Sequence, residues 1–233
     1  MKTFKPKLVF LLLALLLFNS CIVKSLFPFY TQDTIYFEKK FIGNWEEIEK
    51  GQFGDAAIGK WRVITVLEAF LKENKKSKPS ELSDSEFKSY NKYKNGYVVY
   101  FEKDSTESSF LAMPFKINNQ LFLDFTPIED SESDLLKNDL YKRHFIETHT
   151  LAKFDITSDD EINIKWFSSD KLEELLDENR IKIKHEKVGF WETTLLTASS
   201  EELQKFIKKY MNSKDEDKWK TDVEFNLERV YEK

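Results

Sequence analysis

The chain has 233 residues, with 41 acidic and 36 basic side chains and a formal charge of −5. This surplus of negative charge argues against nucleic acid as a partner and against adhesion to anionic lipid through basic residues. A single cysteine excludes an intramolecular disulfide, so packing must hold a fold of this length together. The chain contains 21 Phe, 9 Tyr and 5 Trp, which supply the apolar area for such a core.

The first 20 residues have the organisation of a secretory signal peptide. Lys2, Lys5 and Lys7 form a basic start, and residues 8–18 are an uninterrupted apolar run. At about 1.5 Å per residue this run would extend roughly 16 Å as a helix, about half of a hydrocarbon core near 30 Å. The run is therefore too short to span a bilayer and has the length of an export signal.

The only cysteine, Cys21, follows directly after Asn19 and Ser20. This arrangement resembles a bacterial lipobox, in which the Cys is diacylated and becomes the first residue of the mature chain. The resemblance implies a protein of the bacterial cell envelope that is attached to a membrane, expected to be the outer membrane, through lipid on Cys21. Lipidation would also remove a free thiol from an oxidising compartment. An ordinary export signal with an incidental Cys is the alternative.

The remainder of the chain is rich in short segments with strand periodicity, separated by polar breaks. The expected strands are 60–69, 96–102, 108–117, 120–128, 142–157, 161–167, 190–197 and 223–232. Hairpin turns are expected at Asn118-Asn119 and at residues 158–160. An antiparallel meander of about eight to ten short strands predicts a mainly β fold that closes into a barrel or a sandwich.

Two or three helices are expected to flank the strands. Ser199 and Glu202 have the spacing of a capping box and precede apolar residues at helical spacing, which predicts a helix on the sheet. The expected helices, each with the residues that introduce it, are 200–212 (Ser199, Glu202), 171–179 (Asp170, Glu173) and part of a polar insertion at 72–95 (Ser83, Glu86).

The stretch FIGNWEE places Gly43 and Trp45 in a G-x-W pattern on the first strand of the meander. This pattern is similar to that of the lipocalin and calycin barrels, in which the Trp closes one end of the barrel and stacks on an Arg from a late strand. The resemblance implies a lipocalin-like barrel with a cation–π pair between Trp45 and Arg229. A core Trp in another β fold is the alternative.

A wider resemblance covers most of the chain. The blocks SLFPFYTQDTIYFEKKFIGNW, QLFLDFTP, HFIETHT and LLTASSEELQKFIKKY look like those of a family of uncharacterised bacterial lipoproteins, in this order behind a lipobox Cys. The resemblance implies a signal peptide over 1–20, a lipidated segment over 21–36 and a single β-rich domain over 37–233. It implies no activity and no cofactor.

The sequence offers few residues for chemistry, because it lacks a phosphate-binding loop, a nucleophile elbow and an H-E-x-x-H motif. Strand alternation places Asp124 on the face of Phe122, and Glu147 on the face of His149. Asp124, Glu147 and His149 could therefore converge inside a barrel, where they would suit a metal or a general base with an orienting carboxylate. A satisfied hydrogen-bond network or plain surface residues is the simpler interpretation.

Two functions follow for a membrane-anchored, non-enzymatic envelope protein. The first is binding of a lipid or another apolar small molecule in the barrel interior, which the aromatic strands could line. The alternative is a structural or protein-interaction module with a filled core and no ligand. A hydrolase or metal-dependent enzyme is a third and more distant hypothesis.

Overall fold

The structure is a computed structural model of the chain, and it describes residues 22–48, 58–128, 143–144 and 146–231. Cys21 and the expected signal segment 1–20 lie outside the described residues. Over these ranges, no helix combines the length and the apolar character that crossing a bilayer requires.

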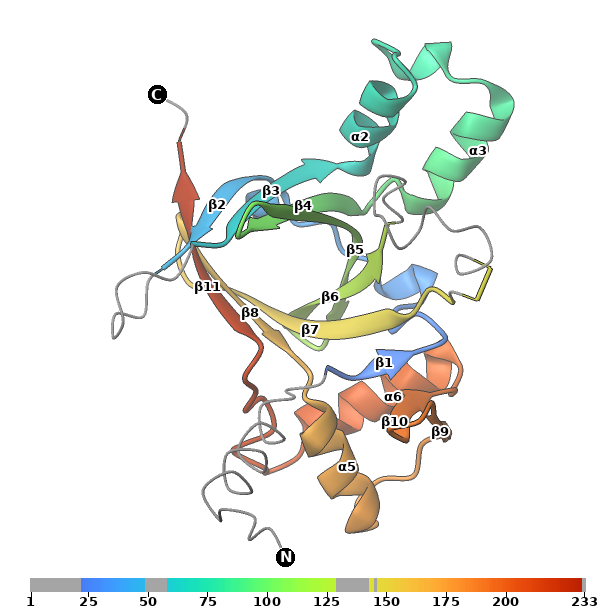
Figure 1. Ribbon diagram of the computed structural model, residues 1–233, viewed down its shortest axis with the longest axis vertical. Coiled ribbons are helices and arrows are strands. Elements are labelled where there is room, and N and C mark those ends of the chain that lie inside the picture. Colours follow the sequence, from blue (N-terminus) through green and yellow to red (C-terminus); the bar gives the residue numbers. More distant parts are fainter. Residues whose placement is uncertain (1–21, 49–57, 129–142, 145, 232–233) are drawn as a thin grey trace, which may run out of the picture.

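Eight antiparallel strands close into a barrel, which confirms the predicted mainly β, lipocalin-like architecture (Figure 1). Around the barrel the order is β2-β3-β4-β5-β6-β7-β8-β11, and β11 pairs with β2 to close the ring. The strands are β2 (Gly43–Glu47), β3 (Lys60–Thr65), β4 (Tyr97–Lys103), β5 (Thr106–Ile117), β6 (Gln120–Pro127), β7 (His149–Ile156), β8 (Glu161–Trp166) and β11 (Glu224–Val230).

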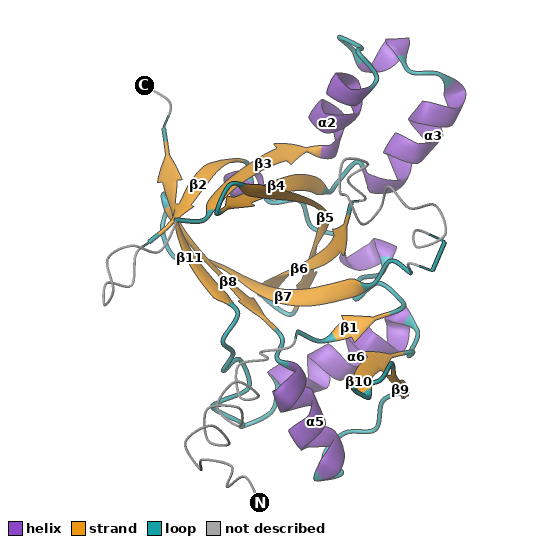
Figure 2. Ribbon diagram, viewed as in Figure 1, coloured by secondary structure: helices purple, strands orange, loops and turns teal. Residues whose placement is uncertain are grey.

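The α-helices of the described chain lie outside the barrel at two ends of the molecule (Figure 2). At one end are α2 (Val66–Glu73) and α3 (Asp84–Tyr93), and at the other are α5 (Ser169–Asp177) and α6 (Ser200–Met211). Three short strands, β1 (Lys24–Ser25), β9 (His185–Val188) and β10 (Thr193–Leu196), form a small extension beside β7. Three 3-10 helices complete the described chain, η1 (Gln32–Thr34), η2 (Lys39–Phe41) and η3 (Pro79–Glu81).

Several local predictions are confirmed at the atomic level. Ser199 and Glu202 form the capping box that starts α6, and α3 begins in the same way. The hairpin between β5 and β6 turns at Asn118, which adopts a φ of 55°. The helix α5 begins earlier than predicted, because the Ser168 hydroxyl, and not Asp170, is at its N-cap.

The predicted strand 60–69 is wrong in its second half, where the structure has a helix. The strand β3 ends at Thr65, whose hydroxyl accepts the backbone N–H of Glu68 at 3.1 Å and so caps α2. The predicted strand 190–197 is also shorter, since β10 begins only at Thr193. In both places an apolar or aromatic run fits a strand by composition, whereas a cap or a turn determines the local structure.

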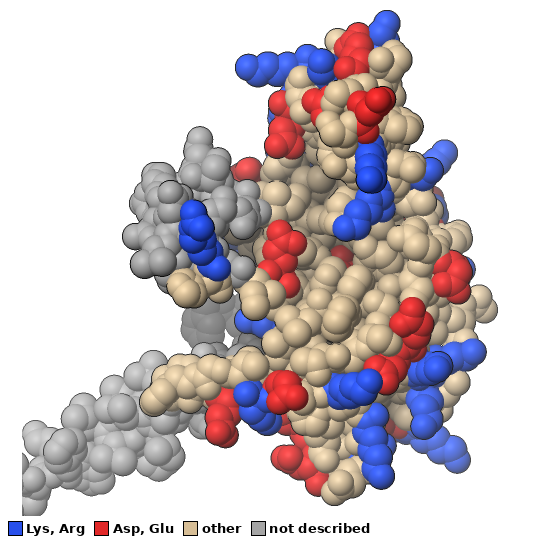
Figure 3. Space-filling model, turned by 90° about the vertical axis from the view of Figure 1, so that its right-hand side faces the viewer, with Lys and Arg blue, Asp and Glu red and all other residues tan. Residues whose placement is uncertain are grey.

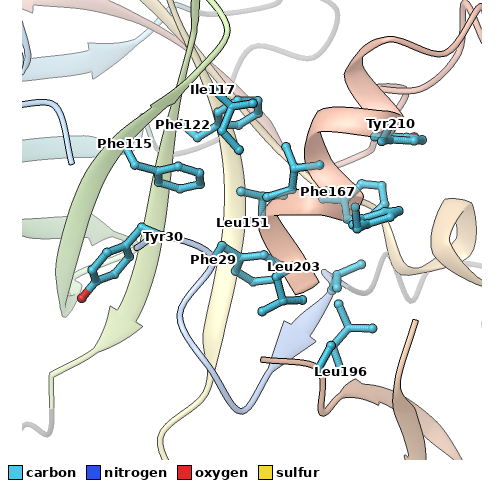
Figure 4. Close-up of a cluster of buried hydrophobic side chains, with 14 of the residues drawn as sticks. Phe29, Tyr30, Phe115, Ile117, Phe122, Leu151, Phe167, Leu196, Leu203 and Tyr210 are labelled. Carbon is cyan, nitrogen blue, oxygen red and sulfur yellow. The ribbon is translucent and has the colours of Figure 1, made fainter. Parts of the chain in front are cut away.

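Two cores share the wall formed by β5, β6 and β7. The first fills the barrel, and the second lies between the outer face of these strands and α5, α6, β10 and residues 22–30 (Figure 4). The labelled side chains of the outer core are Phe29, Tyr30, Phe115, Ile117, Phe122, Leu151, Phe167, Leu196, Leu203 and Tyr210. Because both faces of β6 are buried, its alternation does not distinguish the inner from the outer face.

Candidate functional site

Arg229 closes one end of the barrel over Trp45, as the resemblance to lipocalin barrels implies. The two residues are cross-strand partners, and the guanidinium carbon lies 4.1 Å from the centroid of the indole ring. The guanidinium also donates to the backbone carbonyls of Lys40 at 2.6 Å and Ile42 at 2.9 Å. Gly43 leaves the space for it, since a Cβ at this position would lie 2.4 Å from Arg229 Nη1.

The described barrel interior is packed with aliphatic and aromatic side chains, and many of its aromatic rings contact one another. Trp61 is central, and its exposed fraction is only 4%. Its ring centroid lies 5.1–6.4 Å from those of four other inward-facing aromatic residues, Phe101, Phe125, Trp166 and Phe225. Ring pairs at these distances are ordinary packing contacts, so these side chains are one another's partners.

Two polar atoms within this packed region have no hydrogen-bond partner among the described residues. They are the indole Nε1 of Trp61 and Oε1 of Glu47, and both atoms are buried. The other carboxylate oxygen of Glu47 accepts from Lys103 Nζ at 3.1 Å. A buried polar atom without a partner costs about 1–3 kcal/mol, so a water molecule or a polar ligand group would be favourable beside each of these atoms.

Asp124 and His149, two of the three predicted site residues, form a close pair. Oδ1 of the fully buried Asp124 lies 2.7 Å from Nδ1 of His149, and Oδ2 accepts the backbone N–H of Phe29 at 2.7 Å. The Thr126 hydroxyl lies 3.1 Å from the same ring nitrogen. Burial raises the pKa of the Asp124 carboxyl, while the two hydrogen bonds act in the opposite direction.

The pair lies on the outer face of the barrel, and the prediction that it faces the interior is wrong. Phe122, on the same face of β6, packs in the outer core, while Leu123 and Phe125 face inward. Glu147, the third predicted member, is exposed and makes no hydrogen bond or ion pair with Asp124 or His149. In the part of the chain that the structure describes, no three His, Cys, Asp or Glu side chains gather in a metal-binding arrangement.

Chemically, the arrangement is an imidazole oriented by a carboxylate. His149 Nε2 has no partner among the described residues, and the side chain retains 19% exposure. An imidazole oriented by a carboxylate can act as a general base. However, Asp124 also accepts the N–H of Phe29, so the pair attaches residues 22–30 to β6. The sequence contains no signal for this backbone contact, because it depends on tertiary structure alone.

The described residues form a groove between α5, α6 and residues 179–185, with a volume of about 1260 Å³. Its apolar lining comes from Leu175, Leu176, Ile181, Ile183, Phe206 and Tyr210. Its basic lining comes from Arg180, Lys182, Lys184, Lys205 and Lys209, against two acidic residues, Asp177 and Glu202. The groove is thus apolar at its base and basic at its rim.

The excess of basic over acidic side chains at the groove is not a general property of the surface. On the face shown in Figure 3, basic and acidic side chains are interspersed around an uncharged centre. Two smaller hollows, of about 500 Å³ beside η1 and about 280 Å³ over β2 to β4, are lined by charges of both signs. The groove is therefore larger than these two hollows and has a clearer excess of basic residues.

No protein-family model, no curated protein and no solved structure matches this chain.

Proposed function

We propose that this protein is a lipid-anchored, non-enzymatic module of the bacterial cell envelope, and that it docks a partner protein on its surface. The observation that carries the proposal is the barrel interior, where Trp61 and its neighbours occupy the space that a ligand would need. In this proposal the barrel is a rigid support. Function is then assigned to the outer surface.

The anchor is proposed from the sequence. A basic start, a short apolar run and Cys21 after a small residue support export followed by acylation. The described chain starts at Ile22, directly after this cysteine, and residues 22–30 pack on the barrel wall. The lipid would therefore be joined to the folded domain by very little free chain.

The docking site that we propose is the groove between α5 and α6. Three of its rim cations, Lys182, Lys205 and Lys209, form no ion pair with any described residue. The partner that fits is a segment with acidic groups and apolar side chains, since it would meet both the lysines and the apolar base. The groove is held in shape by Asp215, which accepts from Lys171 and Arg180 at 2.9 Å each.

The docking proposal is tested by photo-crosslinking in intact envelopes. A photoreactive amino acid placed at Lys182 should give a defined protein adduct, and the charge reversal Lys205→Glu in the same chain should remove it. The matched control carries the photoreactive group at Lys60, on the outer face of β3. An adduct that forms equally from both positions, or that survives the charge reversal, would contradict the proposal.

A second candidate is a small ligand in the barrel, and one observation favours it. Trp61 Nε1 and Glu47 Oε1 are buried without partners, and a ligand with a donor and an acceptor would satisfy both. Organic extraction and mass spectrometry test this candidate. A compound recovered from the wild-type protein and lost from Glu47→Gln would support it, whereas an empty extract favours the surface function.

A further inference from the structure

The turn of the β9–β10 hairpin carries two solvent-exposed aromatic side chains. Phe190 is 88% exposed and Trp191 is 82% exposed, which makes them the most exposed large apolar residues of the described chain. Their rings meet edge to face, with centroids 5.0 Å apart. Neither side chain belongs to a core cluster, so folding of the described chain does not explain why this tip is aromatic.

The tip is carried by a supported hairpin. The two strands pair over four positions, from Thr193 opposite Val188 to Leu196 opposite His185. On α5, the Glu173 carboxylate accepts from Lys187 Nζ and from the Thr194 hydroxyl, each at 2.8 Å. The turn itself uses Gly189 at a φ of 73°. The aromatic pair is therefore held away from the body of the protein in a defined direction.

The strand register relates this tip to the start of the described chain. β1 pairs with β10 in parallel, with Lys24 opposite Leu195 and Ser25 opposite Leu196. Two parallel strands begin at the same end of the pair. The residues before Lys24 and the hairpin tip before Thr193 therefore lie at the same end of β1 and β10. Figure 1 shows β1, β9 and β10 grouped beside α6. From Ile22 the chain leads back directly to Cys21.

We propose that Phe190 and Trp191 insert into the interfacial region of the bilayer that holds the lipid of Cys21. Trp and Phe are favoured at the boundary between headgroups and acyl chains, where their exposed rings leave water. The inference rests on the proposed lipid anchor, which brings the tip to a membrane. A single lipid fixes one point of the protein, and a second contact at the hairpin fixes the orientation of the barrel and of the docking groove.

The experiment uses the full chain, processed and acylated by a bacterial host and reconstituted in vesicles of phosphatidylethanolamine and phosphatidylglycerol. Trp fluorescence is compared between vesicles with and without lipids brominated on the acyl chain, for the wild type and for Trp191→Phe. The difference between the two proteins isolates the signal of Trp191. We expect brominated lipid to remove most of this signal, and aqueous iodide to affect it little.

The control variant is Trp219→Phe, which removes a half-buried Trp in the outer core and should leave quenching by brominated lipid unchanged. The mass of the amino-terminal peptide, measured on the same sample, reports on acylation separately. An acylated protein whose Trp191 signal is quenched by iodide and not by brominated lipid would overturn the hairpin inference alone. A peptide without acyl mass would overturn the proposed anchor, and this inference with it.

Discussion

The guanidinium of Arg229 lies 4.1 Å from the centroid of the Trp45 ring and at the same time donates to the carbonyls of Lys40 and Ile42. One side chain from β11 thereby connects β2 and the chain that precedes β2. The contact closes the ring of strands at the point where β11 pairs with β2. Substitutions at this contact therefore test directly what stabilises the closed barrel.

Replacement of Arg229 by Lys should destabilise the protein by about 2 kcal/mol, because a single ammonium cannot stack on Trp45 and bond both carbonyls. Urea denaturation measures the change. The matched control is Arg62→Lys, since Arg62 lies 4.0 Å over the Tyr100 ring on the outer face and should cost only about 0.5 kcal/mol. Equal costs for the two variants would contradict a special role for Arg229.

Gly43→Ala should also be destabilising, by on the order of 2 kcal/mol, because Gly43 has a φ of 142° and its Cβ would overlap Arg229 Nη1. Gly189→Ala is the comparison, since Gly189 also has a positive φ, of 73°, but open space around the position of a Cβ. The alanine at 189 should cost about 1 kcal/mol through the backbone alone. Thermal or urea unfolding measures the stability of both variants. Gly189→Ala should be the more stable of the two.

Asp124→Asn tests the buried pair through its pH dependence. The pKa of Asp124 is raised in the folded protein by burial, above its ordinary value of 3.8. The folded state then binds more protons than the unfolded state, so stability falls as the pH rises from 3.8 through the raised pKa. The stability of the wild type relative to Asp124→Asn should decrease over this range in urea unfolding. A relative stability that increases with pH would show that the His149 contact outweighs burial.

Asp215→Asn should show the opposite sign. Hydrogen bonds from Lys171 and Arg180 lower the pKa of Asp215 from 3.8 to about 2. The folded state therefore gains stability from the ionised carboxyl above pH 3.8 and loses it as the pH falls toward 2. Urea unfolding of the wild type and the variant between these limits should give curves that converge as the pH falls. Parallel curves would indicate that these ion pairs contribute nothing.

Sequence reasoning was most successful where one strong local rule determines the structure. The capping box of Ser199 and Glu202 predicted α6. The pair of Trp45 and Arg229 was instead implied by the resemblance of the G-x-W pattern to lipocalin barrels. Sequence reasoning failed for α2, where the hydroxyl of Thr65 ends a strand that its apolar residues would continue. Strands as short as β1 and β9 carry too few residues for a periodic signal.

At the candidate site, too, the local sequence pattern did not determine which face is buried against what. Alternation correctly placed Asp124 on the face of Phe122, but it assigned this face to the barrel interior. A second core covers the outside of β6, and only the tertiary structure reveals it. The aromatic pair of Phe190 and Trp191 was assigned to a strand for its composition, whereas it forms an exposed tip. Exposure depends on neighbours from distant parts of the chain, so a local pattern does not determine it.

The central claim is that the barrel is filled and that function resides on the surface. The most direct measurement compares the mass of the mature, acylated protein under native and denaturing conditions. Equal masses are predicted, because covalent acyl groups contribute to both and the interior around Trp61 holds only side chains. A native mass that exceeds the denatured mass by one stoichiometric apolar compound would contradict the account and make the protein a carrier.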